Sequence, residues 1–210
     1  MIVMNQVGDP TMGTASTTGA DHALAVEQGR TVIAAARQAH VHVIHVTFGC
    51  YTTDGSDLEF FKQRTIGDEH SKLQERNVPH EYSPAPGEAV LLTSTTSAFA
   101  STGLEQILKN MHVVYPIFVG SFTDGCLGLT AADSISRGFL PTVVGDASLG
   151  SCRVSHLSML RLFDQHWGRV RDRCCLLCIY MPAIDISFSA CRYAALQSWS
   201  LRSKRRSWPG

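Results

Sequence analysis

The sequence predicts an α/β fold in which helices pack on a mostly parallel β-sheet, and two observations support this prediction. Short β-branched apolar runs alternate along the chain with longer segments of helical periodicity, which is typical of βαβ units. The loops that follow these runs are polar. Ligands in such folds bind beyond the carboxyl ends of the strands, so the loops after Phe48, Leu92 and Val119 are the places to look for chemistry.

The first half of the chain supplies three of the expected strands and one helix. Ile2-Val3-Met4 is a short apolar run that predicts a strand at the very start. Asp21 is a suitable N-cap for a helix over 22–39, whose apolar residues share one face. Strands are also expected over 41–48 and 89–92, on either side of the polar loop 49–88.

The second half continues the alternation. Thr102-Gly103-Leu104-Glu105 has the pattern of a capping box ahead of a helix. The apolar run 113–119 predicts a strand, although Pro116 removes one donor from its ladder. The remaining expected elements are a polar turn over 120–125, a helix over 126–137 that ends at Gly138, a strand over 139–144 and a helix over 156–167.

Composition is that of an ordinary folded domain. The chain has 210 residues, 44% of them apolar, with 18 basic and 18 acidic residues. These values exclude disorder, collagen and a coiled coil, and the zero net charge gives no reason to expect a nucleic-acid partner. Charge is uneven, however: 12 basic and 17 acidic residues stand up to position 172, and 6 basic and 1 acidic after it. We therefore expect one domain over 1–172 and an atypical basic, Cys-rich tail over 173–210.

Cysteine usage and apolar runs bear on the compartment. Seven cysteines is an odd number without the spacing of a disulfide framework, so a reduced, cytoplasmic protein is expected. The first residues have no basic segment followed by a long apolar one, which does not fit a signal peptide. The apolar run Cys174–Met181 is much shorter than the ~20 residues that span a bilayer, so no membrane association is expected.

The segment from Val119 to Leu127 is the most informative one. Cys126 stands where an expected strand turns into an expected helix, and the positive end of the helix dipole stabilises a thiolate there. Backbone N–H groups of such a turn are expected to be unpaired and able to hold an oxyanion. This pattern predicts a nucleophilic cysteine. Alternatively, Cys126 is a small buried residue that packs the helix against the sheet.

Several motifs, in order along the chain, resemble those of the isochorismatase-like cysteine hydrolases. They are Asp54–Asp57, Pro84–Glu88, Ser97-Ala98-Phe99 with Thr102 and Leu104, Gly120–Leu127, Thr130–Asp133, Arg137-Gly138-Phe139 and Val144–Ala147. The matches cover roughly residues 22–172. The resemblance implies a three-layer α/β/α fold with a Rossmann-like sheet, an oligomer, and hydrolysis of an amide or related C–N bond of a small molecule.

The resemblance also implies a set of site residues. Cys126 would be the nucleophile and its N–H would serve the oxyanion hole, with a cis peptide bond within the turn 120–123, which contains Ser121, Phe122 and Thr123. Phe48, Phe99 and Asp124 are the residues expected to line the substrate pocket. No cofactor and no metal is expected.

Two members of the family's Asp, Lys and Cys triad are replaced in this chain. Thr93 stands where the family has its Lys, and a Thr cannot supply a positive charge. Gln6 matches the family's first motif, but Met4 or Asn5 stands in the place of the Asp, and Asp9 is the nearest acid. Loss of a general acid or base typically costs ~10²–10⁴-fold in rate.

Other candidates are weaker. His40, His42 and His45 are expected to be partly exposed residues on or beside a strand, and a metal pair is the alternative. The C-x-x-C at Cys175–Cys178 has no second pair at zinc-site spacing. The basic run Lys204–Arg206 is expected to be solvated.

Three hypotheses for the function remain at this point. The first is a cysteine hydrolase that acts on a small amide through Cys126. The second is an inactive family member that serves as a binding or oligomer partner. The third is a truncated, splice-type product, suggested by the short first strand and by the change of composition near residue 172.

Overall fold

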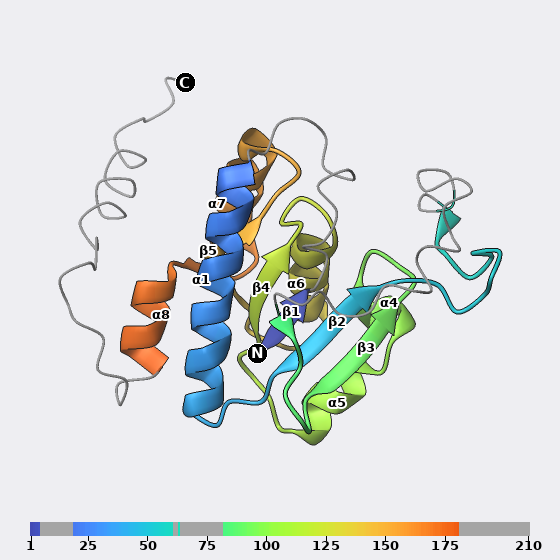
Figure 1. Ribbon diagram of the computed structural model, residues 1–210, viewed down its shortest axis with the longest axis horizontal. Helices are drawn as coiled ribbons and strands as arrows, with labels where there is room; N and C mark the ends of the chain where they lie inside the picture. Colours follow the sequence, from blue (N-terminus) through green and yellow to red (C-terminus); the bar gives the residue numbers. More distant parts are fainter. Residues whose placement is uncertain (5–18, 61–62, 64–81, 181–210) are drawn as a thin grey trace.

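The computed structural model describes residues 1–4, 19–60, 63 and 82–180, and its centre is one six-stranded parallel sheet (Figure 1). The strand order is β3-β2-β1-β4-β5-β6. The predicted α/β fold on a parallel sheet is confirmed. The strands are β1 (Ile2–Met4), β2 (Ile44–Phe48), β3 (Ala89–Thr93), β4 (Ile117–Ser121), β5 (Thr142–Leu149) and β6 (Arg169–Arg171).

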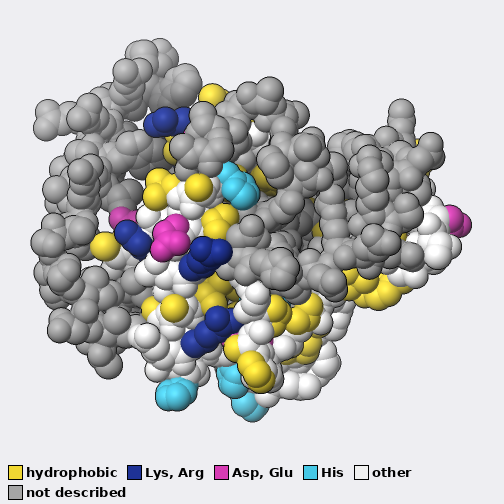
Figure 2. Space-filling view, in the orientation of Figure 1, with side chains coloured by type: hydrophobic (Ala, Val, Ile, Leu, Met, Phe, Trp, Pro, Cys, Tyr) yellow, Lys and Arg dark blue, Asp and Glu magenta, His cyan; other side chains and the backbone are white. Residues whose placement is uncertain are grey.

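Helices cover both faces of this sheet. On one face, α1 (Gly19–Gln38) packs on β4 and β5 and contacts α8 (Arg173–Tyr180). Figure 1 shows these two helices side by side in front of the sheet, with α6 behind it. The other face carries α4 (Ala98–Ser101), α5 (Leu104–Asn110), α6 (Cys126–Ser136) and α7 (Arg153–His166). On the face seen in Figure 2, the described basic and acidic side chains are interspersed among apolar ones.

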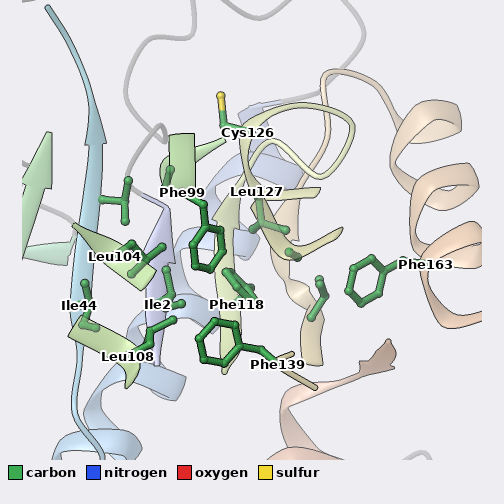
Figure 3. Close-up of a cluster of buried hydrophobic side chains, with 14 residues drawn as sticks. Ile2, Ile44, Phe99, Leu104, Leu108, Phe118, Cys126, Leu127, Phe139 and Phe163 are labelled. Atoms are coloured by element: carbon green, nitrogen blue, oxygen red, sulfur yellow. The ribbon is translucent and has the colours of Figure 1, made fainter. Parts of the chain in front are cut away.

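The two faces have separate hydrophobic cores, because successive side chains of a strand point to opposite sides of the sheet. Val3, Val119 and Val144 face α1, where Val32 and Ile33 complete their cluster. The residue before each of these valines points to the opposite face, into the cluster shown in Figure 3; these residues are Ile2, Phe118 and Val143. Aromatic and leucine side chains complete that cluster: Phe99, Leu104, Leu108, Leu127, Phe139 and Phe163.

The strand order reverses between β1 and β4, where the chain crosses from the edge strand β3 to the far side of β1. Met4 at the end of β1 pairs in register with Gly120 near the end of β4. In open α/β sheets, ligands bind in the crevice beyond the carboxyl ends of the strands at such a reversal. The turn that follows β4 therefore lies at the position expected for a binding site.

Several expected boundaries were wrong, each because of a local interaction. The strand expected over 41–48 begins at Ile44, because His40 adopts φ 54° and the Val41 N–H donates to the Ala36 carbonyl at the end of α1. Asp21 lies in the first turn of α1 and is not its N-cap. The strand expected over 113–119 covers 117–121 and begins after Pro116. The strand expected over 139–144 covers 142–149, and its pairing with β4 is interrupted by a bulge after Phe118. The last expected helix begins at Arg153, with Cys152 as N-cap.

The capping box did not form. Thr102 Oγ1 accepts from the Leu104 N–H at 3.1 Å and donates to the Ala98 carbonyl at 2.7 Å, because a short helix that the sequence analysis missed, α4, ends just before it. Glu105 instead pairs with Lys109 at 2.6 Å and also with Arg137.

Helix α8 continues the packed body beyond residue 172. Leu176 is completely buried and belongs to the cluster on the α1 face. Asp146 and Asp172 hold the start of this helix by accepting the N–H groups of Arg173 and Cys175, each at 2.8 Å. Part of the apolar run in the expected tail therefore contributes to the core.

An ion network joins α1, β2 and the residue before β3. Glu88 accepts hydrogen bonds from Arg37 Nε and Nη2, each at 2.8 Å, and lies 2.8 Å from His45 Nε2. His45 is completely buried, so the expectation of a partly exposed histidine was wrong for this residue. Its imidazole is part of a structural network that fixes α1 on the sheet.

Candidate active site

The turn after β4 is held from two sides. A cis peptide bond joins Ser121 to Phe122, within the segment where one was expected. The Thr123 N–H donates to the Leu149 carbonyl at 2.8 Å, which ties the turn to the end of β5. The Phe122 carbonyl accepts from the N–H groups of Gly125 at 3.0 Å and Leu127 at 3.1 Å. These bonds fix the direction in which α6 leaves the sheet.

The expectation of unpaired N–H groups at this turn and the start of α6 was wrong for four of them, those of Thr123, Gly125, Leu127 and Gly128. The Leu127 N–H and, at 3.4 Å, the Gly128 N–H both donate to the Phe122 carbonyl. Gly128 also allows the turn to lie against the helix, because a Cβ at this position would stand 1.8 Å from the Thr123 carbonyl oxygen. The chain around Cys126 is thus closely packed on its backbone side.

Cys126 is the first residue of α6 and its side chain is 2% exposed. Figure 3 shows its sulfur at the edge of the core cluster, pointing away from Phe99 and Leu127. Leu127 is the next residue and its side chain points into the core, where it is completely buried. The thiol therefore lies at the positive end of α6, beyond the carboxyl end of β4, as the strand-to-helix pattern predicted.

Thr93 ends β3 and is 1% exposed. Its hydroxyl donates to the Thr95 carbonyl at 2.9 Å and lies 2.9 Å from Ser101 Oγ. Thr95 Oγ1 in turn lies 3.0 Å from the same Ser101 oxygen. The position at which the sequence analysis expected the family's Lys is surrounded by a neutral cluster of hydroxyl groups.

Two of the motifs noted in the sequence bind each other. Ser97 Oγ donates to Asp133 Oδ2 at 2.7 Å, and the Ala98 N–H donates to Thr130 Oγ1 at 3.1 Å. Burial raises the pKa of Asp133, but the Ser97 hydrogen bond and Arg137 outweigh it and hold that pKa below its ordinary value. The segment that follows Thr93 is thereby fastened to α6, one turn beyond Cys126. Sequence reasoning missed this role of Asp133, although its motif was noted.

The other expected site residues lie in separate environments. Ser121 is completely buried, and its Oγ has no hydrogen-bond partner among the described residues. Phe48 packs with Cys50 and Leu58 in a small separate cluster. Phe99 stacks on Phe139 with ring centroids 6.0 Å apart, beneath the Arg137 guanidinium.

Asp124 ties the turn to the loop before α7. Its carboxylate accepts from the Ser151 N–H at 2.9 Å and from the Ser151 hydroxyl. Asn5 and Asp9, the residues considered for the acid's place, lie outside the described residues. Their relation to Cys126 stays a prediction.

Metal and membrane features were searched within the same described ranges. Among these residues no group of three or more His, Cys, Asp or Glu is arranged to hold a metal ion. Within them, too, none of the helices is both long and apolar enough to cross a bilayer.

Comparisons with known proteins agree with this architecture. The family model for the isochorismatase domain matches residues 9–173. A cysteine hydrolase from Pseudomonas syringae pv. phaseolicola superposes with a TM-score of 0.75 at 20% identity, over 87% of this chain and 92% of the other. An N-carbamoylsarcosine amidase from Thermoplasma acidophilum gives a TM-score of 0.64 at 24% identity, over 81% and 94% of the two chains. At these identities the structural likeness establishes the fold.

Proposed function

The chain belongs to the isochorismatase domain family, and from this premise we propose that it is a hydrolase that opens an amide-type C–N bond of a small molecule with Cys126 as nucleophile. The observation that carries the proposal is the place of Cys126, at the first residue of α6 and beside the point where the strand order reverses. The likeness to a cysteine hydrolase and to an amidase that acts on N-carbamoylsarcosine supports the choice of bond.

The proposed reaction has two halves. The Cys126 thiolate attacks the carbonyl carbon, the negative oxygen is held near the first N–H of α6, and the C–N bond breaks as the nitrogen takes a proton and leaves. Water then attacks the thioester, which releases the acid and restores the thiol. The proton has to be carried by an acid, for which we propose Asp9, the nearest acidic residue in the sequence after β1; Asn5 is neutral and cannot carry it.

The replacement of the family's Lys by Thr93 is proposed to make this reaction slow. A lysine ammonium near the thiol would favour both the thiolate and the developing oxyanion, and a hydroxyl cluster does neither. The helix N-terminus remains as the source of positive potential at Cys126.

The test is the hydrolysis of a panel of small amides and carbamoyl compounds by the full chain and three variants. Cys126→Ala should lower turnover by roughly 10³-fold or more, because the covalent route is lost. Thr93→Lys should raise it by about 10²-fold, which is the typical worth of one charged group in the transition state. Thr93→Met, which matches lysine in length without the charge, should give no gain.

Equal turnover by the wild type and Cys126→Ala would disprove the assignment of Cys126 as the nucleophile. A folded Thr93→Lys protein without activity on any compound would favour an inactive member that serves as a binding partner. Melting curves of each variant show whether it is folded. The proposed homo-oligomer is tested on the same samples by light scattering after gel filtration, and the proposed cytoplasmic location by fractionation of cells.

A further inference from the structure

A second cavity lies on the far side of the turn from β1, between the first half of α1, the end of β5 and the first turn of α7. Its volume is ≈ 220 Å³. The polar residues that line it are Asp21, Gln28, Asp146, Ser148, Cys152, Arg153 and His156. Cys126 is not among the described residues that line this cavity, so the cavity is separate from the proposed active site.

Two buried polar atoms of the cavity wall have no hydrogen-bond partner among the described residues. They are Ser148 Oγ and Gln28 Oε1. Ser148 is only 4% exposed. Buried polar atoms are nearly always paired, and an orphan in a cavity wall points to a missing partner. Two such atoms from different elements, β5 and α1, indicate that the partner is a molecule in the space between them.

The exposed rim of the cavity combines two leucines with the charged residues Asp21, Asp146 and Arg153. Leu24 of α1 and Leu157 of α7 both line it and are 58% and 49% exposed. A pocket that combines apolar side chains with a few convergent polar groups is the usual form of a small-molecule site. A dry cavity of about 150 Å³ holds a benzene ring, so this one has room for a ring and a short polar arm.

The two unpartnered oxygens of the cavity wall can both accept hydrogen bonds: Gln28 Oε1 only accepts, and Ser148 Oγ accepts as well as donates. The carboxylates of Asp21 and Asp146 add negative charge to the lining, which also contains the guanidinium of Arg153. Asp146 itself accepts the Arg173 N–H at 2.8 Å and lies 3.8 Å from Arg173 Nε, so no ligand contact is assigned to it. Burial lowers the pKa of His156, so its imidazole adds no positive charge at neutral pH.

We propose that this cavity binds a small molecule that joins an apolar ring to a primary amine, with the amine donating to Gln28 Oε1 and Ser148 Oγ and the ring lying between Leu24 and Leu157. The site does not depend on Cys126. Its wall nevertheless contacts the turn before Cys126, because Thr123 bonds both to the Leu149 carbonyl and, at 2.9 Å, to His156 Nδ1. The Thr123 amide is therefore a reporter of occupancy.

The test uses phenethylamine as the probe and follows backbone amide shifts of the full chain by NMR. We expect saturable shifts at Gly145, Gly150 and Thr123 with a Kd on the order of 1 mM, as expected for a ligand of this size. Phenylacetate, which replaces the donor by an acceptor, should bind at least tenfold more weakly. Cys126→Ala should bind phenethylamine as the wild type does, whatever its activity.

Variants locate the amine. Ser148→Ala and Gln28→Met each remove one acceptor and should weaken binding by about 3- to 10-fold, the worth of one hydrogen bond. Ser158→Ala, an exposed serine on α7, is the matched control and should bind like the wild type. If Ser148→Ala does not fold, Gln28→Met decides alone. The proposal is overturned by the absence of saturable shifts up to ~10 mM, by equal binding of phenylacetate, or by variants that bind like the control.

Discussion

The ion network around Glu88 should make folding sensitive to acid, and Glu88→Gln isolates the effect. The Arg37 hydrogen bonds, with further ones from the Ala85 N–H and His45, lower the pKa of Glu88 from 4.5 to about 2, against the opposing effect of burial. The unfolded chain therefore binds a proton at a higher pH than the folded one does. The stability from this group is fully present above pH 4.5 and is lost as the pH falls towards 2.

The size of the effect follows from the two pKa values. The fall from 4.5 to about 2, at 1.36 kcal/mol per pKa unit, corresponds to about 3 kcal/mol. The side chains of Glu88 and Arg37 are 11% and 36% exposed, so solvent partly screens the ion pair and about 3 kcal/mol is the upper figure. Glu88→Gln keeps the shape and removes the charge, which leaves Arg37 without its carboxylate. We expect a loss of about 1–3 kcal/mol in the free energy of unfolding at pH 7.

Urea unfolding followed by circular dichroism, at several pH values from 7 to 3, measures this difference. The gap between wild type and Glu88→Gln should narrow steadily below pH 4.5, because the wild type loses its advantage there. Glu27→Gln is the matched control: Glu27 and its partner Arg30 are 67% and 53% exposed, and such a pair contributes little. A gap that stays constant from pH 7 to pH 3, or one no larger than the control's, would refute the reasoning.

Three further substitutions test other parts of the fold by the same unfolding assay. Gly128→Ala should lower the free energy of unfolding by about 2 kcal/mol or more, because its Cβ would stand 1.8 Å from the Thr123 carbonyl oxygen. Gly103→Ala is the control and should cost far less, because a Cβ there meets open space. Equal losses for the two variants would contradict the close approach at Gly128. Leu176→Ala should cost about 2–5 kcal/mol as a core truncation, unlike Leu157→Ala, and no loss would show that α8 adds nothing to the core. Ser97→Ala and Asp133→Ala should show a coupling energy of about 1 kcal/mol in a double-mutant cycle. Strictly additive losses would show that the two motifs do not stabilise each other.

Local patterns were sufficient for the elements whose signal is contiguous. Alternating strands and helices predicted the parallel sheet, and the coincidence of a strand end with a helix start predicted the place of Cys126. Strand β6 was missed because Arg169-Val170-Arg171 is too short and too charged to give a strand pattern. The end of β5 was missed because Gly145-Asp146 reads as a turn, although here these residues form a bulge within a strand.

Pairings between distant residues could not be read from local patterns. His45 and Glu88 are 43 positions apart, and an exposed strand histidine and a buried paired one give the same local sequence. The hydroxyl cluster at Thr93 depends on Ser101, eight positions later, which reaches it only because α4 folds back over the strand end. For position 93, the sequence could predict only that the side chain carries no charge.

The contacts around Thr93 hold its segment against α6 although the side chain at position 93 carries no charge. Ser97 and Ala98 hold the segment after Thr93 against α6, through Asp133 and Thr130, so the geometry that relates residue 93 to the helix does not depend on a lysine. Two unit charges 4 Å apart interact by about 4 kcal/mol at an effective dielectric constant of about 20. A 10²-fold gain in rate requires about 2.7 kcal/mol, which is within that amount. An ammonium placed at position 93 by Thr93→Lys is a sufficient perturbation if it comes within about 4 Å of the thiolate, and Thr93→Met separates its charge from its length.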